Sequence, residues 1–190
     1  MRTSAPISFL EFSKLGFVAM RPPTAEFEAW DAFPAEIRAA LGAVVIEWAR
    51  FENSLASLFA KVLRSPDENA WVVYYNMGSF SGRCDLIRRI LDHDKNRSDI
   101  AADIEKLLSD SIPVAGTRND LAHGFWRYFK HPEGGKDVCI VGQFKPRKPS
   151  EKSTYKLEPD VKFLTDLANK IASLTERAAA LGYKMRKASV

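Results

Sequence analysis

The feature that most constrains the fold of this chain is one long amphipathic segment, residues 34–63. Apolar side chains recur there at steps of three and four residues, which places them on one face of an α-helix. They are Ile37, Leu41, Val44, Trp48, Phe51, Leu55, Leu58 and Val62. Because a helix with one apolar stripe must bury that stripe against other elements, the segment predicts a core helix inside a helical bundle.

Three later segments have the same helical spacing of apolar residues: 81–94, about 98–112 and 159–183. Residues 67–79 predict either a short helix or the beginning of the next one. Pro113 predicts a kink or a short break, because proline lacks the backbone N–H and clashes with the preceding helical turn. Beyond it we expect the helix to resume and to end near Gly124.

Two short segments favour β-strands instead. Residues 137–144 are rich in β-branched side chains and follow the turn signal PEGG, and residues 153–158 form a suitable partner. Two strands cannot form a core alone, so the hairpin, over about 137–158, is predicted as an appendage. The predicted fold class is all-α, an up-and-down bundle of four to five helices with this small β-hairpin.

The predicted domain organisation is one helical domain over residues 34–182, with a segment of different character on either side. Residues 1–33 combine prolines with several aromatic residues, and we expect an irregular arm that packs partly on the body. Gly182 is predicted to end the last helix, so that residues 183–190 form a basic tail.

The composition indicates the cellular compartment of the protein and whether it can hold a metal ion. The 190 residues contain no stretch of about 18 apolar residues, which argues against a membrane-spanning helix. Glu11 and Lys14 interrupt the first apolar residues, which makes them a poor signal peptide. Cys84 and Cys139 are the only cysteines and stand far apart, which favours a reducing cytoplasm and offers no zinc-ligand spacing. We therefore expect a cytoplasmic protein, and the sequence implies neither a metal nor an organic cofactor.

The net charge of +4 permits an anionic partner without requiring one. The basic excess is concentrated between Arg127 and Lys156, where eight lysines and arginines stand against three acids. This segment is either a solvated loop or a rim that contacts phosphates.

One short segment combines residue types that suit chemistry on a phosphodiester. The stretch TRNDLAHGFW holds Arg118, Asn119 and His123. The arginine–histidine spacing alone is a weak signal, since Arg88 and His93 share it, and we interpret that second pair as surface residues. The first pair differs in its context, because Asn119 lies at helical spacing from His123. The stretch also follows two core helices and precedes an aromatic cluster, the hairpin and a last long helix.

In this order of elements, RNDLAHGFW resembles the signature of the HEPN superfamily, small helical-bundle proteins found widely in prokaryotic toxin–antitoxin and antiviral systems. That signature is an arginine, usually followed by a polar residue, and then a histidine after four to six positions. Arg118, Asn119 and His123 match it. The segment IEWARFENSL also looks like the part of the first long helix that packs against the motif in such proteins. The resemblance covers roughly residues 34–181, and only the motif is specific.

The resemblance implies one of two functions. Many HEPN proteins are metal-independent endoribonucleases, hydrolases that work as dimers, and others have lost catalysis and bind a nucleotide or a protein partner. The residue types fit the first function, because the 2′-hydroxyl of RNA is a built-in nucleophile and an imidazole with a pKa of about 6.5 serves as base or acid near neutral pH. We expect His123 to be the general acid/base and Arg118 to stabilise charge on the phosphate. Asn119 would orient the histidine or bind a phosphate oxygen.

The spacing of the motif also favours a homodimer. On a straight helix, five steps place Arg118 and His123 about 140° apart around the axis, with ~7.5 Å of rise. Asn119 and His123 are only about 40° apart by the same geometry. One chain also offers one candidate histidine for two proton transfers, whereas a two-fold dimer supplies two. We therefore expect a homodimer that binds RNA or a nucleotide, in a defence or toxin–antitoxin setting with an antitoxin or other protein as a further partner.

The same residues also have structural interpretations. His123 at a helix end can interact with exposed backbone carbonyls, and Arg118 can pair with Glu47 or Glu52 in a buried network. Four residues beyond the motif are candidates for RNA contact: Trp126, Arg127, Tyr128 and Lys130. The two aromatic residues among them either stack on splayed bases or belong to the core or an interface.

Overall fold

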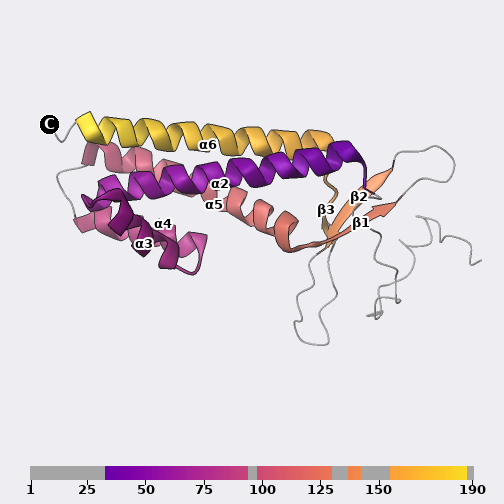
Figure 1. The fold of residues 1–190 in the computed structure, drawn as a ribbon, viewed down its shortest axis with the longest axis horizontal. Helices are drawn as coiled ribbons and strands as arrows, with labels where there is room; N and C mark the ends of the chain where they lie inside the picture. Colours follow the sequence, from indigo (N-terminus) through magenta and orange to yellow (C-terminus); the bar gives the residue numbers. More distant parts are fainter. Residues whose placement is uncertain (1–32, 94–97, 130–136, 143–154, 188–190) are drawn as a thin grey trace, which may run out of the picture.

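The computed structural model describes residues 33–93, 98–129, 137–142 and 155–187, and shows a helical bundle with a small sheet at one end (Figure 1). The helices in this part of the chain are α2 (Ala35–Leu63), α3 (Asp67–Asn76), α4 (Phe80–His93), α5 (Ser98–His123) and α6 (Val161–Lys187). The strands are β1 (Phe125–Phe129), β2 (Val138–Gly142) and β3 (Tyr155–Leu157). The predicted all-α bundle with a β appendage is confirmed.

Three long helices form the body of the molecule. α2 and α6 lie side by side and both run away from the sheet, and α5 runs back toward it (Figure 1). The shorter helices pack at the end far from the sheet, α3 on α2 and α4 on both α2 and α5. None of the helices in the described ranges is both long and apolar enough to cross a membrane.

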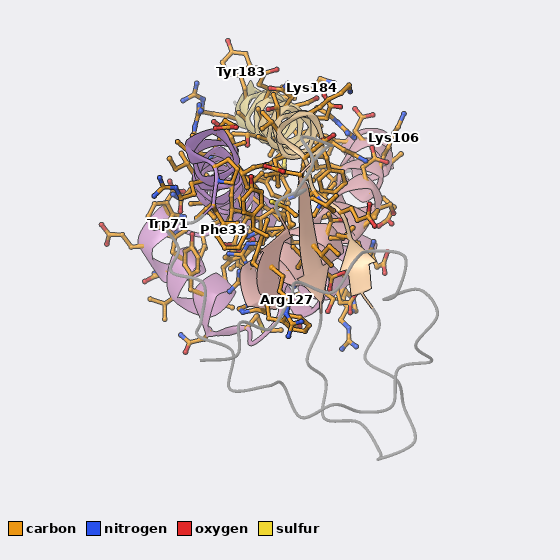
Figure 2. All side chains as sticks on the ribbon, turned by 90° about the vertical axis from the view of Figure 1, so that its right-hand side faces the viewer. Phe33, Trp71, Lys106, Arg127, Tyr183 and Lys184 are labelled. Atoms are coloured by element: carbon orange, nitrogen blue, oxygen red, sulfur yellow. The ribbon has the colours of Figure 1, made fainter. Side chains whose placement is uncertain are left out.

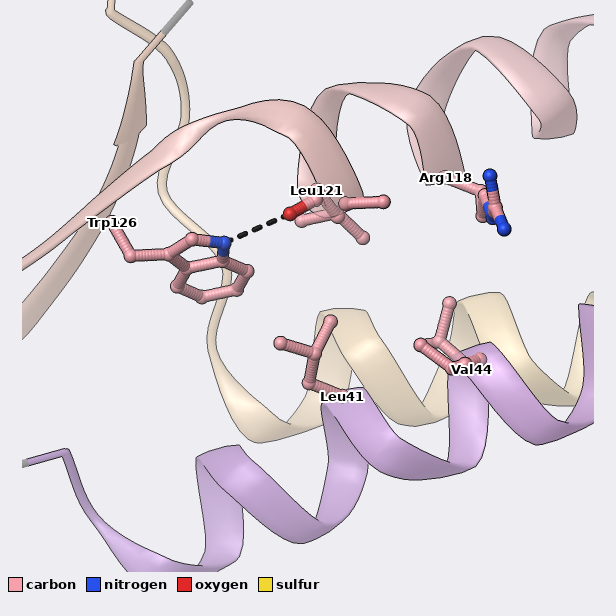
Figure 3. Close-up of a pocket in the computed structure, with 7 residues that line it drawn as sticks. Leu41, Val44, Arg118, Leu121 and Trp126 are labelled. Carbon is pink, nitrogen blue, oxygen red and sulfur yellow. Dashed lines mark hydrogen bonds between the residues drawn. The ribbon is translucent and has the colours of Figure 1, made fainter. Parts of the chain in front are cut away.

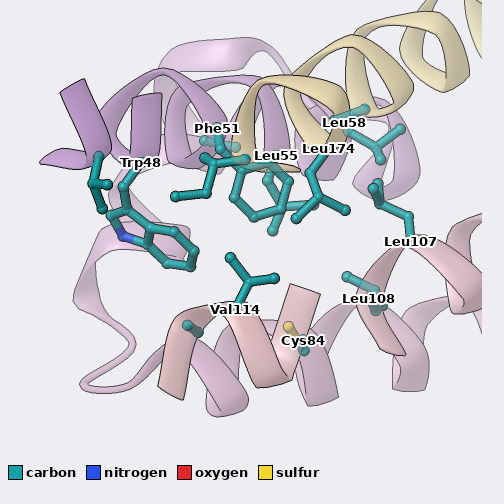
Figure 4. Packing of buried hydrophobic residues seen from close by; sticks show 14 of the residues in the cluster. Trp48, Phe51, Leu55, Leu58, Cys84, Leu107, Leu108, Val114 and Leu174 are labelled. Atoms are coloured by element: carbon teal, nitrogen blue, oxygen red, sulfur yellow. The ribbon is translucent and has the colours of Figure 1, made fainter. Parts of the chain in front are cut away.

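The core is one continuous cluster of apolar side chains to which all five helices contribute. Figure 4 shows its centre, where the stripe of α2 meets side chains of α4, α5 and α6. The labelled members are Trp48, Phe51, Leu55, Leu58, Cys84, Leu107, Leu108, Val114 and Leu174. Full burial of a side chain of this size is worth about 1.5–3 kcal/mol, so the stripe of α2 accounts for much of the driving force that assembles the bundle.

Of the kink or short break that Pro113 predicts, the break does not occur, because α5 is one helix from Ser98 to His123. Pro113 lies on the exposed side of α5, where water can satisfy the carbonyl that has lost its N–H partner. Leu108 and Val114 are buried on either side of it, and their packing holds the helix in place.

The predicted end of the last helix at Gly182 is also wrong, since α6 continues to Lys187. A glycine inside a helix costs about 1 kcal/mol relative to alanine. Leu181 and Met185 are both buried and lie four residues apart, so the apolar stripe continues past Gly182 and offsets that cost. The proposed tail therefore begins inside the helix.

The predicted hairpin is present as β2 and β3, and the structure adds a third strand. β1 follows α5 directly and pairs antiparallel with β2, which is the middle strand. Phe125 of β1 stands opposite Gly142, and a Cβ there would meet the Phe125 ring at 2.3 Å. The absence of a side chain at Gly142 thus leaves the space that the Phe125 ring occupies.

The junction between α5 and β1 depends on Gly124. Its N–H donates to the carbonyl of Asp120 at 2.9 Å, and α5 ends there as predicted. A Cβ added at Gly124 would lie 2.4 Å from that carbonyl oxygen and 2.4 Å from Cγ1 of Val141. The absence of a side chain thus brings the last turn of α5 directly against the sheet.

Of the predicted arm, only Phe33 is among the described residues, and it is buried. Its ring lies 6.3 Å from that of Trp126 and 5.8 Å from that of Tyr128, measured between centroids. Figure 2 looks onto this end of the molecule and labels Phe33 beside the sheet. Residues 1–32 and 188–190, which hold the rest of the arm and the end of the tail, lie outside the described residues.

The junction can be tested with two glycines, Gly124 just after α5 and Gly116 inside it. Gly124→Ala is expected to lower the free energy of unfolding by about 1–3 kcal/mol, because the methyl group overlaps Asp120 and Val141. Gly116→Ala is the matched control, since nothing lies within 4 Å of its Cβ position, and it should raise the free energy by about 0.5–1 kcal/mol. Urea unfolding followed by circular dichroism measures both, and effects of the same sign would contradict this account of the junction.

Candidate functional site

The motif residues occupy the last two turns of α5, at the end of the bundle that carries the sheet. Arg118 is half-buried and faces α2, whereas Asn119 and His123 are exposed. Because α5 is continuous here, the helical geometry applies and separates Arg118 from His123 by about 140° around the axis. The guanidinium and the imidazole of one chain therefore lie on different sides of the helix.

Arg118 is held by two contacts, and one of its donor atoms is buried without a partner among the described residues. Its guanidinium carbon lies 5.6 Å from the centroid of the Trp48 ring, a cation–π contact, and Nη1 donates to Oδ1 of Asn119 at 3.0 Å. Its Nε is buried and has no hydrogen-bond partner among the described residues. An unpaired buried donor costs about 1–3 kcal/mol, so an acceptor placed there, such as a phosphate oxygen, would be stabilising.

His123 is the last residue of α5 and is exposed. Within the described part of the chain its imidazole makes no hydrogen bond or ion pair, so the ring is open to a ligand from solvent. Asn119 bonds to Arg118, which means that its amide positions the guanidinium in this structure. The structure thus brings Arg118 and Asn119 together and leaves His123 accessible, but it does not bring the imidazole to the guanidinium within one chain.

A groove lies between α2 and α5 next to Arg118 (Figure 3). We call it the Arg118 groove; its volume is about 340 Å³. Apart from Arg118 its walls are apolar: Leu41, Val44, Val45, Leu121, Ala122 and Trp126. Trp126 stands at the sheet end, where its Nε1 donates to the carbonyl oxygen of Leu121 at 2.9 Å and so fixes the indole.

The two aromatic candidates for RNA contact differ in their surroundings. Trp126 is half-buried and lines the groove, whereas Tyr128 is 9% exposed and packs on Phe33. The hydroxyl of Tyr128 donates to Oδ2 of Asp137, and this hydrogen bond raises the pKa of Tyr128 to about 12. Of the two aromatic candidates, Trp126 therefore lines the groove, whereas Tyr128 contacts Phe33 and Asp137.

Arg127 points its guanidinium over the ring of Phe125, at 5.6 Å from the centroid. It lies at the sheet end of the molecule, where Figure 2 labels it. Lys130 lies outside the described residues, as do residues 130–136 and 143–154 of the basic segment.

The alternative pairing of Arg118 with a glutamate of α2 is not formed in the described structure. Glu47 accepts a hydrogen bond from Arg50 at 2.9 Å, and Glu52 pairs with Arg83. Stacking on Trp48 replaces the expected ion pair of Arg118.

In the second pair with the motif's spacing, the arginine has partners of its own. Arg88 donates to both carboxylate oxygens of Glu105, at 2.8 and 3.0 Å, and these bonds hold the pKa of Glu105 below its ordinary value. His93 is exposed at the end of α4. The surface interpretation of this pair is thus confirmed, and it supplies control residues for experiments on the motif.

The residues of the site that sequence reasoning missed are on α2. Leu41, Val44 and Val45 line the groove. The sequence predicts the first two as part of the core stripe, and Val45 lies off that stripe. The available signal was the run Val44–Val45–Ile46, which broadens the apolar face beyond what one core stripe requires. Elsewhere in the described ranges, no three His, Cys, Asp or Glu side chains gather as a set of metal ligands.

The contact between Tyr128 and Asp137 gives a pH prediction. The fold favours the neutral phenol, so this contribution to stability is complete below pH ~10, the ordinary phenol pKa, and is lost as pH rises through about 12. Asp137→Asn is expected to lower the pKa of Tyr128 and to move that loss of stability toward pH ~10. Absorbance titration of the phenolate measures the shift. The Tyr128→Phe variant should lack the phenolate titration that is assigned to Tyr128. An unchanged titration in Asp137→Asn would contradict the role of Asp137 in raising the pKa of Tyr128.

Comparison of the chain with models of protein families, with curated proteins and with solved structures finds no match. The resemblance to HEPN proteins therefore rests on the motif and on the order of elements alone.

Proposed function

We propose that this chain is a metal-independent endoribonuclease of the HEPN type, acting in the cytoplasm in a defence or toxin–antitoxin setting. The observation that supports it is the state of the motif: an exposed imidazole at His123 and an unpartnered buried N–H on Arg118, on the last two turns of α5. RNA cleavage needs an accessible acid–base group and a cation that can bind phosphate oxygens. Arg118 lines an open groove, and His123 is exposed at the end of the same helix.

In the proposed reaction the 2′-hydroxyl of one nucleotide attacks the adjacent phosphorus. One imidazole takes the hydroxyl proton as the P–O bond forms, and an imidazolium gives a proton to the 5′-oxygen as the old P–O bond breaks. The products are a 2′,3′-cyclic phosphate and a 5′-hydroxyl. Arg118 binds the phosphate oxygens as their charge develops, and Asn119 is a positioning residue that holds the guanidinium through its 3.0 Å hydrogen bond.

The proposal includes a homodimer, because one chain does not supply the whole reaction. His123 is the one histidine of the motif, and Arg118 lies about 140° away from it around α5. A two-fold axis beside the last turn of α5 would set the imidazole of one copy near the guanidinium of the other and bring two imidazoles to one phosphate.

A second candidate function is a non-catalytic module that dimerises and binds a nucleotide or a protein. The observation that favours it is the surface of α3, whose apolar side chains are largely exposed. They are Trp71, Val72, Val73 and Tyr75. Exposed apolar patches on soluble proteins commonly mark binding surfaces. An antitoxin that covered α3 would be compatible with both the ribonuclease and the binding module.

The ribonuclease proposal is tested by incubating the protein with mixed RNA in EDTA. Wild type is expected to cleave and to leave 2′,3′-cyclic phosphate ends, and His123→Ala should lower the rate by about 10²–10⁴-fold. His93→Ala is the matched control, since His93 has the same spacing from an arginine, and it should keep full activity. Absence of cleavage by wild type, or equal activity of the His123 variant, would leave only the binding module.

The dimer is tested by mixing wild type with a ninefold excess of His123→Ala protein. If both imidazoles act in one site, random pairing places about one wild-type chain in ten with a wild-type partner, and activity per wild-type chain falls about tenfold. An equal excess of His93→Ala protein should not lower activity. Wild-type activity that is insensitive to excess His123→Ala would show that each chain works alone.

A further inference from the structure

The Arg118 groove has two chemically different ends. One end is the indole of Trp126, which its hydrogen bond to Leu121 and its edge contact with Phe33 hold in place. The other end is the guanidinium of Arg118 (Figure 3). Aliphatic side chains of α2 and α5 form the walls between them. A ligand that fits this groove is flat or apolar along most of its length and anionic at one end.

A nucleotide has this division, with a π-faced base and a charged phosphate. The volume of about 340 Å³ falls at the lower end of the range of ~300–1,000 Å³ for small-molecule sites, and such sites are mostly apolar with a few polar groups. We propose that the Arg118 groove binds the unpaired base of one RNA nucleotide, with a phosphate of that nucleotide at Arg118. This inference rests on the proposed ribonuclease function and adds to it the kind of RNA that is bound.

The walls determine how the base is recognised. Val45 and Ala122 offer no side-chain hydrogen bond, and the Nε1 of Trp126 is already bonded to Leu121. The base edges are therefore not read, and recognition depends on contact with the π-face, which all four bases share. A base can enter such a groove only when it is unstacked and unpaired. We infer a substrate of single-stranded RNA with little preference for sequence.

The phosphate end rests on an independent observation. The Nε of Arg118 is buried without a partner in the described structure, although Nη1 is bonded to Asn119. Because this Nε has almost no accessible surface, a phosphate oxygen would satisfy it with a charge-assisted hydrogen bond once the Arg118 side chain turns toward the groove that it lines. An apolar peptide segment would fill the walls and leave the donor unpaired, so the charge favours a nucleotide as the occupant.

The test uses two neighbouring positions on α2 in the full chain carrying His123→Ala, which prevents cleavage during binding. Val45→Trp places an indole in the groove, since Val45 lines it at 48% exposure. Ile46→Trp is the matched control, because Ile46 is 62% exposed and is not part of the lining. The probes are 5′-labelled hexamers of uridylate and of adenylate, the same hexamers with one base removed, and a duplex of equal length. Fluorescence anisotropy gives the affinities.

The expected result is that Val45→Trp weakens binding of both intact hexamers about tenfold and that Ile46→Trp changes it less than twofold. The His123→Ala protein with an unchanged groove should also bind the intact hexamers more tightly than the duplex or the hexamers that lack a base. Ala122→Trp fills the groove from the opposite wall and should reproduce the effect, which guards against misfolding of one variant. Equal affinities of the Val45 and Ile46 variants, or no loss on removing a base, would overturn the inference.

The failure of this inference differs from the failure of the proposed function. If wild type does not cleave RNA but the Val45 and Ile46 variants still differ in binding, the groove binds nucleotides in a protein that is not a nuclease. If wild type cleaves and the two variants bind alike, the nuclease stands and the base lies elsewhere.

Discussion

The burial of one face of α2 is the constraint on which the structure depends. Trp48, Phe51 and Leu55 on that face lie in the core between α5 and α6. Their packing fixes the position of α2 along both helices. The Trp48 ring also lies beneath the guanidinium of Arg118. Packing of the core and placement of a candidate catalytic group are therefore coupled through one indole, because a shift of α2 moves the surface on which Arg118 rests.

The long helices were predictable because each needs only a repeat of apolar residues, and tertiary packing acts on the same residues. α3 lacks such a repeat, so the sequence left open whether it is a separate helix. The misassigned positions are those where burial outweighs a local preference. Pro113 and Gly182 disfavour helix locally, yet buried neighbours such as Val114 and Met185 keep α5 and α6 intact. β1 was missed because Phe125 directly follows the predicted helix end at Gly124, and its strand partner lies across a segment of the chain that local patterns do not connect.

The candidate site was predictable only in part for a related reason. Spacing along one helix gave the positions of Arg118, Asn119 and His123, and the angle between the first and the last follows from helical geometry alone. The groove could not be predicted from the spacing of the motif, because its opposite wall includes Leu41 on a helix far earlier in the chain. Likewise, the amide of Asn119 turns to Arg118 because the guanidinium is held nearby over α2, which depends on tertiary contacts.

Phe33 has a consequence for the affinity of the groove. It is buried against the edge of the Trp126 indole, directly before α2 begins, so the start of the helical body and one wall of the groove share a contact. Thermodynamic linkage then requires reciprocity: whatever displaces Phe33 loosens the indole, and whatever seats a ligand against the indole holds Phe33 more firmly. If the groove binds a ligand as proposed, the contact between Phe33 and Trp126 couples the residue just before α2 to that binding.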